Sequence, residues 1–277
     1  MTIEWFPGHM AAARKKAAET MAKVDVVLEV LDARLPGASS NPLIARLRQE
    51  RQRPCLKILN KADLADPQAS AAWVRHFGAE KHVTAVAISS KRADDVAKIP
   101  RLAAALVPHR EGKSVRMMVM GVPNVGKSTL VNALLKRKAA KTGDEPAITR
   151  HQSRFILGGR HELIDTPGLV SPSTGSERDA LMLAASHLIG PESYAGEEVA
   201  AFLGDVLVAR YPALVRTRYD LEADAPDGHA LIATIARKRG YLRRGGAPDL
   251  DKAGRALLQD YRSGLLGRIS LETPPKP

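Results

Sequence analysis

The chain has 277 residues, enough for one sizeable core and a smaller second domain, and 44% of them are apolar while 26% are charged. No stretch approaches the roughly 20 uncharged apolar residues that span a bilayer, and the N-terminus lacks the pattern of a secretory signal, so we expect a cytoplasmic protein with no membrane partner. The 42 Lys and Arg against 30 Asp and Glu give a formal charge of +12, which favours polyanionic partners, although a solvated basic surface would give the same balance.

The first half of the chain is typical of a parallel sheet with crossover helices. Continuous apolar and β-branched stretches predict buried strands, and apolar spacings of three and four predict helices. The strands are expected at 24–31, 55–59 and 83–88, and the helices at 42–50, 67–77 and 94–107. Because the two kinds of element alternate, we expect parallel strand pairs with helices on both faces.

A polar connector at residues 108–114 leads into a second group of elements. A strand is expected before a glycine-rich loop, a helix after it, and then two strands around the hairpin signal Gly158-Gly159, at 115–120, 127–137, 154–157 and 162–164. The residues between Asp32 and Gly37 are expected to form a loop.

From about residue 176 onward the strand signals cease. Helical patterns continue almost to the C-terminus, with breaks near Pro191, Pro212, Pro226, Gly245-Gly246 and Pro248, and residues 274–277 look like a frayed tail. We therefore expect an α/β domain at residues 1–176 and an all-α domain at residues 177–277.

Residues 121–128 match the pattern G-x-x-x-x-G-K-S between a predicted strand and a predicted helix. Gly121 and Gly126 allow the backbone to turn its N–H groups inward, as a chain of phosphates requires. In this pattern Lys127 reaches the outer phosphates and Ser128 binds Mg²⁺. A chance match in a glycine-rich turn is the alternative, which the flanking elements disfavour. The predicted nucleotide contacts of this loop are Asn124, Val125, Gly126, Lys127, Ser128 and Thr129.

Asn60-Lys61-Ala62-Asp63 follows a predicted strand and has the composition of a guanine-reading loop. Guanine presents two N–H donors on one edge, which a single carboxylate such as Asp63 can accept together, whereas adenine lacks the matching pair. We expect Asn60 to brace the loop and the stem of Lys61 to cover one face of the ring. A simple Asn-Asp turn would be the better interpretation if this tetrapeptide stood alone.

Asp165-Thr166-Pro167-Gly168 ends a predicted strand after the phosphate loop. Asp165 is expected to be linked to Mg²⁺, and the N–H of Gly168 is expected to sense the γ-phosphate, although a plain Pro-Gly turn is the alternative. Thr149 is the candidate threonine that completes the Mg²⁺ shell. The predicted metal ligands are thus Ser128, Thr149 and Asp165, and Lys127, Thr149 and Gly168 are predicted to act in catalysis.

In the order of these motifs the chain resembles the circularly permuted GTPases of the ribosome biogenesis GTPase A family (RbgA/YlqF). The motifs that carry the resemblance lie at 5–10, 32–34, 60–63, 121–128, 165–168 and 265–272. Ordinary GTPases have the phosphate loop first, and reading this chain from Val115 and then returning to Val24 restores that order. Ala147 is a departure, because the family usually has glycine there, and alanine allows the switch less backbone freedom.

The resemblance implies a GTPase that binds GTP, GDP and Mg²⁺ and converts GTP to GDP and phosphate. It implies an assembly factor acting in late maturation of the large ribosomal subunit, with hydrolysis stimulated by the ribosome and coupled to release, and with the protein monomeric off the ribosome. It also places a backbone N–H of Ser89-Ser90 against the guanine carbonyl. The alternative is a GTP-sensing, RNA-binding assembly scaffold in which hydrolysis is incidental, and an ATPase fits Asn60 and Asp63 poorly.

The residue that positions the attacking water is a separate question. Leu169 stands where many GTPases carry a glutamine, so that group must come from elsewhere in the chain or from a partner. His9 is the candidate within the chain, because the resemblance places it in a distinctive motif and imidazole exchanges protons near neutral pH, although its motif could merely begin a helix. Asn124 matches a position associated with K⁺ in several relatives, with a loop-bracing amide as the alternative.

Residues 237–268 carry nine basic and three acidic side chains, with Tyr241 and Tyr261 among them. This composition suits contacts with RNA phosphates and stacking on bases or riboses. A solvated charged helix face is the alternative, and the resemblance favours ribosomal RNA.

Overall fold

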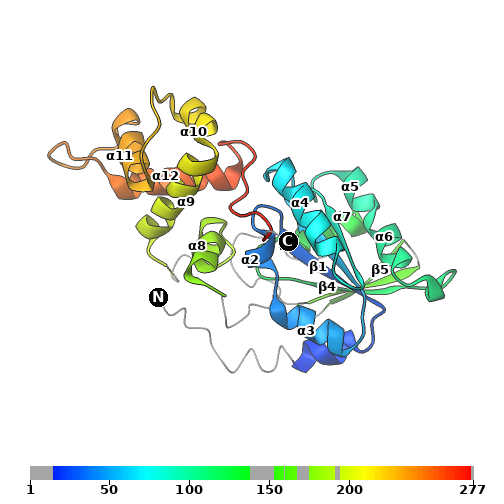
Figure 1. The fold of residues 1–277 in the computed structure, drawn as a ribbon. Coiled ribbons are helices and arrows are strands. Elements are labelled where there is room, and N and C mark those ends of the chain that lie inside the picture. The colour runs from blue at the N-terminus through cyan, green and yellow to red at the C-terminus, as the bar shows by residue number, and fades with distance from the viewer. Residues whose placement is uncertain (1–14, 138–152, 159, 167–174, 191–193, 276–277) are drawn as a thin grey trace.

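The computed structural model describes residues 15–137, 153–158, 160–166, 175–190 and 194–275 (Figure 1). In this part of the chain a six-stranded sheet has the order β3-β2-β1-β4-β6-β5. Neighbouring strands are parallel except for the antiparallel pair of β5 and β6. The strands are β1 (Val26–Asp32), β2 (Cys55–Asn60), β3 (Val83–Ala87), β4 (Arg116–Met120), β5 (Ser153–Leu157) and β6 (His161–Asp165). The predicted sheet and its strands are therefore confirmed.

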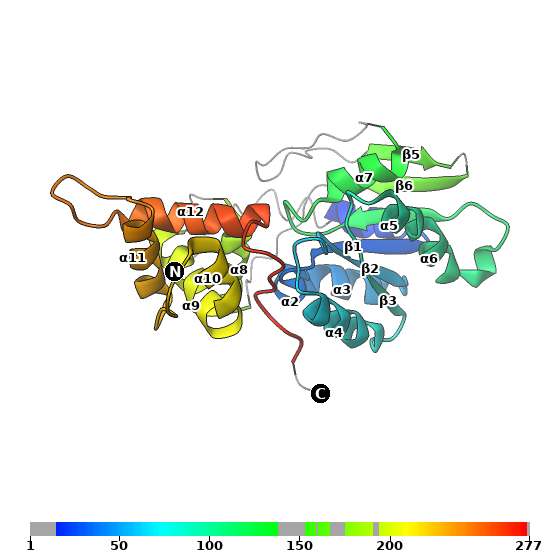
Figure 2. The same ribbon diagram turned by 90° about the horizontal axis from the view of Figure 1, so that it is seen from above.

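Helices cover both faces of this sheet (Figure 2). The side chains of β1 alternate between two cores, because successive residues of a strand point to opposite faces. Val27 and Leu31 pack in one core with α3 and α4, whereas Val26 and Val30 pack in the other with α5, α6 and α7. These helices are α3 (Pro42–Glu50), α4 (Pro67–Gly78), α5 (Ala93–Ala97), α6 (Ile99–Ala105) and α7 (Lys127–Leu135).

Two local predictions in this half were wrong, and the connector at residues 108–114 was right but incomplete. The helix expected at 94–107 is two helices, because Pro100 cannot continue α5 and instead lies in the first turn of α6. The loop expected after β1 contains a single helical turn, α2 (Pro36–Ser39), which begins at a proline. The connector contains a 3₁₀ turn, η1 (Pro108–Arg110).

Beyond β6 the described chain is helical, and the helices lie to one side of the sheet (Figures 1 and 2). They are α8 (Glu177–Ala185), α9 (Gly196–Arg210), α10 (Pro212–Tyr219), α11 (Gly228–Lys238) and α12 (Leu250–Ser263). Two of the predicted breaks are prolines at helix boundaries: Pro212 begins α10, and Pro226 lies between α10 and α11. The breaks at Gly245-Gly246 and Pro248 lie in a small hairpin before α12. Pro191 is outside the described residues.

The helical region is organised around α9, which contacts α8, α10, α11 and α12. Gly204 on α9 faces Gly228 on α11 so closely that a Cβ at Gly204 would lie 2.6 Å from the Gly228 Cα. Glycine is therefore required for this helix crossing. In the described part of the chain, none of the helices combines the length and the apolar character needed to cross a membrane.

Candidate functional site

The motifs predicted from the sequence meet at one edge of the sheet. Strands β1, β2, β3, β4 and β6 are mutually parallel, so the loops that follow them leave the sheet at the same edge. Asp32 and Asn60 end β1 and β2 at this edge, and the loops after β3, β4 and β6 carry Ser89, Gly121 and Thr166. This edge is where open α/β sheets bind their ligands.

Residues 121–128, called here the phosphate-type loop, have the backbone geometry that their two glycines predict. Gly121 and Gly126 have φ values of 149° and 95°. A Cβ on Gly121 would collide with the carbonyl oxygen of Val30, and a Cβ on Gly126 would collide with the side-chain amide of Asn60. The two glycines therefore allow the loop to lie directly against β1 and against residues 60–63, which are called here the guanine-type motif or loop.

Helix α7 begins at the end of this loop, with Gly126 as its N-cap. The N–H groups of its first turn have no partners within the helix and favour an anion. Lys127 is buried and its Nζ donates a hydrogen bond of 2.8 Å to the carbonyl oxygen of Val122. Burial lowers the pKa of Lys127 to about 8, partly opposed by the charge of Asp165. Ser128 is half-buried and Thr129 is exposed in the same turn.

Asn60 connects three of the loops. Its Nδ2 donates 2.9 Å to the carbonyl oxygen of Val125 in the phosphate-type loop. Its Oδ1 accepts hydrogen bonds from the backbone N–H of Ser90 at 3.1 Å and from the Ser90 hydroxyl at 2.7 Å. Asn60 is 2% exposed, so its amide is committed to this bracing.

Asp63 lies at the open side of the site, where Lys91 pairs with it at 3.1 Å. Burial alone would raise the pKa of Asp63, but hydrogen bonds from Ser89 and Lys91 outweigh burial and hold the pKa below its usual value. Asp63 is therefore ionised at neutral pH and can accept hydrogen bonds. The Lys91 side chain is exposed, so this ion pair lies at the surface of the site.

Asp165 ends β6 with a carboxylate that is 1% exposed. Its Oδ1 has no hydrogen-bond partner among the described residues. Burial raises the pKa of Asp165, partly opposed by the nearby charge of Lys127. The next residue, Thr166, donates its hydroxyl to the carbonyl oxygen of Val119 at 2.7 Å, which holds the end of β6 against β4. An unpartnered buried carboxylate oxygen beside Lys127 fits a divalent cation or its water.

A buried ionic cluster of Asp32, Arg34 and Lys61 lies beside the guanine-type loop, and the sequence interpretation gave Asp32 and Arg34 no role in the site, whereas Lys61 was expected to cover the ring. Asp32 pairs with Arg34 at 2.8 Å and with Lys61 at 2.9 Å, and the Lys61 Nζ also donates 2.8 Å to the carbonyl oxygen of Asn124. Burial alone would raise the pKa of Asp32, but the two cations outweigh burial and lower it. A charged residue at the end of a fully buried strand was the signal that could have revealed it.

The carboxyl end of α8 joins this cluster to the helical region. The last carbonyl groups of a helix have no partner inside the helix. Here they accept hydrogen bonds from the phosphate-type loop, from the loop after β1 and from α12. The contacts are Asn124 to His187 at 2.9 Å, Arg34 to Ser186 at 3.4 Å, and Arg262 to Ala185 and Ala184 at 2.8 and 2.9 Å.

The described structure corrects the prediction that Tyr261 stacks on RNA. Tyr261 is 2% exposed, the Arg34 guanidinium lies 4.9 Å from the centre of its ring, and its hydroxyl bonds Ser186 at 2.9 Å. Arg262 and Arg268 also direct their guanidinium groups to backbone carbonyls of this chain. Arg262 is half-buried, so the exposed basic set is slightly smaller than the sequence indicated, and it comprises Arg237, Lys238, Arg239, Arg243, Arg244, Lys252, Arg255 and Arg268.

Several predicted residues lie outside the described part of the chain. These are His9, Thr149, Gly168 and Leu169, together with the N-terminal motif at residues 5–10. Their roles remain predictions. The structure brings together Asn60, Lys61, Asp63, Ser89, Ser90, Asp165 and the phosphate-type loop.

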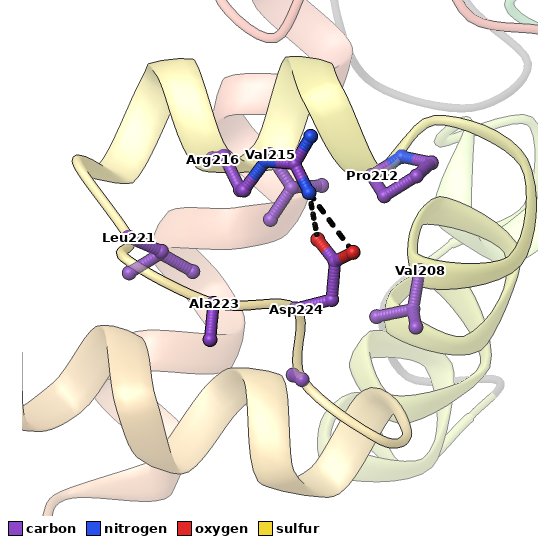
Figure 3. A pocket seen from close by; sticks show the side chains of 8 residues that line it. Val208, Pro212, Val215, Arg216, Leu221, Ala223 and Asp224 are labelled. Carbon is purple, nitrogen blue, oxygen red and sulfur yellow. Dashed lines mark hydrogen bonds and ion pairs between the residues drawn. The ribbon is translucent and has the colours of Figure 1, made fainter.

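The helical region contains a small hollow that is separate from this site (Figure 3). It lies beside α9 and α10, where Arg216 bonds both carboxylate oxygens of Asp224 at 2.8 and 2.9 Å. Its volume is about 10 Å³, which is about the space of one water molecule. It cannot hold a nucleotide.

Comparison with known proteins agrees with this geometry. A family profile described as a 50S ribosome-binding GTPase matches residues 116–199. The chain is 36% identical over 283 residues to the ribosome biogenesis GTPase A of Bacillus cereus, covering 99% of this chain and 95% of that protein. It is 34% identical to the mitochondrial ribosome-associated GTPase 1 of Ictalurus punctatus, covering 97% of this chain and 92% of the relative.

A solved structure has the same fold. The GNP-bound YlqF of Thermotoga maritima superposes with a TM-score of 0.66 at 24% identity, over 96% of this chain and 100% of that one. This likeness supports the permuted arrangement that starts at β4 and returns through β1 to β3. By sequence and by fold, the chain belongs to the ribosome biogenesis GTPase A family of circularly permuted GTPases, which hydrolyse GTP.

Proposed function

We propose that this GTPase acts in late maturation of the large ribosomal subunit, that the subunit stimulates its hydrolysis of GTP, and that hydrolysis accompanies release. The matched profile is described as a 50S ribosome-binding GTPase, and relatives are named for ribosome biogenesis. The formal charge of +12 suits a partner rich in RNA. In this account the protein works in the cytoplasm, where ribosomes are assembled, and is a monomer off the subunit.

The nucleotide occupies the edge of the sheet described above. Asp63 accepts the two N–H donors of guanine, and a backbone N–H of Ser89 or Ser90 approaches the guanine carbonyl. The loop from Asn124 to Thr129 surrounds the phosphates, with Lys127 at the outer ones. The supporting observation is that Asn60 bonds both Val125 and Ser90, which fixes the base side of the site relative to the phosphate side.

Ser128 and Asp165 would hold Mg²⁺, and Thr149 is proposed to complete its shell. The unpartnered Oδ1 of Asp165 and its position beside Lys127 support this assignment. A bound Mg²⁺ neutralises charge that develops on the phosphate oxygens during transfer. Lys127 contributes charge at the same phosphates, and the N–H of Gly168 is proposed to respond to the γ-phosphate.

Two roles in hydrolysis are proposed for residues that the resemblance marks. His9 is proposed to orient the attacking water, because Leu169 cannot do so. Asn124 is proposed to support K⁺ dependence, because the resemblance associates its position in the phosphate-type loop with that ion. If His9→Ala loses GTP affinity but keeps the single-turnover rate, His9 does not orient the water. Equal hydrolysis rates in KCl and in NaCl would contradict the role of Asn124.

The helical part, residues 177–277, is proposed as the domain that contacts ribosomal RNA, with residues 1–176 as the GTPase domain. A hairpin between α11 and α12 projects from the helical region (Figure 1). Leu242 bridges Pro248 across it, and its tip carries the exposed side chains of Arg243 and Arg244. Two guanidinium groups on a projecting tip suit phosphate contacts in structured RNA.

One observation carries the coupling between nucleotide and RNA. Asn124 of the phosphate-type loop and Arg262 of α12 both bond carbonyls at the carboxyl end of α8. Helix α8 follows the Asp165–Gly168 motif in the chain, so a change at the γ-phosphate can move α8 relative to the basic helices. Nucleotide state would then set the affinity for the subunit.

Cosedimentation with purified large subunits tests this proposal. We expect the protein to sediment with subunits in a non-hydrolysable GTP analogue and to remain in the supernatant with GDP. Arg262→Ala should reduce that difference without weakening GDP binding, and Gln259→Ala, an exposed change on the same helix, should leave it intact. Equal sedimentation of the wild-type protein in both nucleotides would favour the scaffold alternative, in which hydrolysis is incidental.

A further inference from the structure

The chain does not end in the helical region but returns to the sheet. After α12 the residues 264–272, called here the C-terminal strap, run back toward the loops after β1 and β2 (Figures 1 and 2). Leu266, Ile269, Ser270 and Leu271 in the strap are each at most 2% exposed. This burial shows that the strap is part of the packed structure.

The strap is hydrogen-bonded to both loops through its backbone. The N–H of Ile269 donates 2.9 Å to the carbonyl oxygen of Leu64, directly after Asp63. The N–H of Leu271 donates 2.7 Å to the carbonyl oxygen of Arg34. The strap thus fixes the guanine-type loop relative to the ionic cluster of Asp32.

Arg268 holds the two sides of the guanine-type loop. Its Nη2 donates 2.8 Å to the carbonyl oxygen of Ala62, and its Nε donates 2.9 Å to the carbonyl oxygen of Ala65. These carbonyls flank Asp63 and Leu64 in the chain. A planar guanidinium donates along fixed directions, so it sets the spacing of the two carbonyls. With the bond to Leu64, the strap supplies donors to three carbonyls around Asp63.

The far side of the loop is held through the helical region. Tyr211, between α9 and α10, accepts the N–H of Ser270 at 3.1 Å and lies 3.1 Å from a carboxylate oxygen of Asp66. The hydroxyl of Ser270 accepts the N–H of Asp66 at 3.1 Å. Asp66 itself caps α4. Both ends of the segment from Ala62 to Asp66 are therefore held by the strap.

We propose that the C-terminal strap sets guanine specificity, with Arg268 as the positioning residue for Asp63. Recognition of the two N–H donors of guanine by one carboxylate requires a fixed loop, because a rotated carboxylate keeps at most one of the two hydrogen bonds. The strap provides that fixation without touching the base. This inference rests on the proposed role of Asp63 and assigns part of that specificity to a segment about two hundred residues away in the chain.

Inosine diphosphate provides the discriminating probe, because its base lacks the exocyclic amino group and presents only one of the two N–H donors. The dissociation constants of GDP and IDP would be measured by calorimetry on the full chain, with KM and kcat for GTP. Arg268→Ala should weaken GDP binding by about tenfold, the order expected for losing charge-assisted hydrogen bonds. The binding of IDP should weaken less, so the preference for GDP over IDP falls. The KM for GTP should rise, while kcat stays the same.

Three further variants make the result interpretable. Arg46→Ala removes the same charge from an exposed position on α3 and should behave as wild type. Arg268→Lys should lie between wild type and Arg268→Ala, because one ammonium cannot reproduce the planar fork. Tyr211→Phe should lower the GDP preference in the same direction. If Arg268→Ala does not fold, the lysine and phenylalanine variants decide.

Arg268→Ala, Arg268→Lys and Tyr211→Phe are called here the strap variants. The proposal is overturned if they keep the wild-type ratio of GDP to IDP affinity. It is also overturned if both nucleotides weaken equally along with a lower melting temperature, since that result indicates general destabilisation. Asp63→Asn separates this failure from failure of the site itself. If Asp63→Asn still prefers GDP to IDP, Asp63 does not read the base. If Asp63→Asn loses this preference while the strap variants retain it, only the strap proposal fails.

Discussion

The Nδ2 of Asn60 donates a 2.9 Å hydrogen bond to the carbonyl oxygen of Val125, so one buried amide joins the guanine-type motif to the phosphate-type loop. The contact also explains Gly126, whose missing Cβ makes room for that amide. The two motifs lie far apart in the chain and in inverted order, yet this hydrogen bond restores the arrangement of an unpermuted GTPase site.

Removing the Asn60 amide should weaken nucleotide binding. Asn60→Ala deletes the bond to Val125 and both bonds from Ser90, and Asn60→Asp places an acceptor against the Val125 carbonyl. We expect GDP affinity to fall at least about tenfold in both variants, since each lost hydrogen bond costs about 1 kcal/mol. Calorimetry with GDP measures it, with the exposed change Gln259→Ala as control. Unchanged affinity in Asn60→Ala would show that the brace is dispensable.

Asp63→Asn should change the preferred base from guanine to xanthine. Xanthine has a carbonyl group where guanine has its amino group, and the asparagine amide can donate to that carbonyl while its oxygen accepts the ring N–H. Competition of GDP and XDP for the variant and the wild type measures the preference. A variant that binds neither base, although it is folded by circular dichroism, would argue against the assigned geometry.

Breaking the buried cluster should cost stability. Asp32→Asn leaves Arg34 and Lys61 without their carboxylate, and loss of one partner of a buried ion pair costs about 3–5 kcal/mol. Urea unfolding measures the free energy. Asp251→Asn removes an exposed pair with Arg255 and should cost at most about 1 kcal/mol. Equal costs for the two variants would show that the cluster is not stabilising.

The same cluster predicts a pH dependence. The pKa of Asp32 is lower in the folded chain than the usual 3.8, so below that value the unfolded chain binds more protons. The contribution of Asp32 is therefore fully present above the usual pKa and is lost as the pH falls toward the folded pKa. Unfolding free energies measured between neutral pH and pH values below 3.8 should fall more steeply in the wild type than in Asp32→Asn. Parallel curves would contradict this account.

RNA binding should depend on the hairpin tip and on salt. Changing both Arg243 and Arg244 to alanine should weaken binding to ribosomal RNA and reduce the slope of log affinity against log salt by about two. The matched control changes Arg46 and Lys81, two exposed basic residues of the GTPase half, and should retain the wild-type slope. Filter binding across a salt series measures both quantities. A flat response in the wild-type protein would exclude this face as an RNA contact.

The sheet and the meeting of the motifs could be predicted because both depend on local signals. Apolar strands such as Val26–Asp32 are recognisable alone, and parallel strands bring their loops to one edge. The split at Pro100 also had its signal in the sequence, a proline within a helical pattern.

The burial of Tyr261 and the return of Arg268 to the guanine-type loop had no such signal. Both depend on how the helical region packs against the sheet. A tyrosine or arginine on a basic helix has the same spacing whether it faces RNA or a backbone carbonyl of its own chain.

GTP turnover with and without purified large ribosomal subunits tests the central claim most directly. The account predicts that subunits raise kcat of the wild-type protein, and that Lys127→Ala, which removes the ammonium group beside Asp165, shows neither basal nor stimulated turnover. Small subunits at the same concentration should have no effect. A wild-type rate unchanged by large subunits would contradict the account and leave the protein as a scaffold that senses GTP.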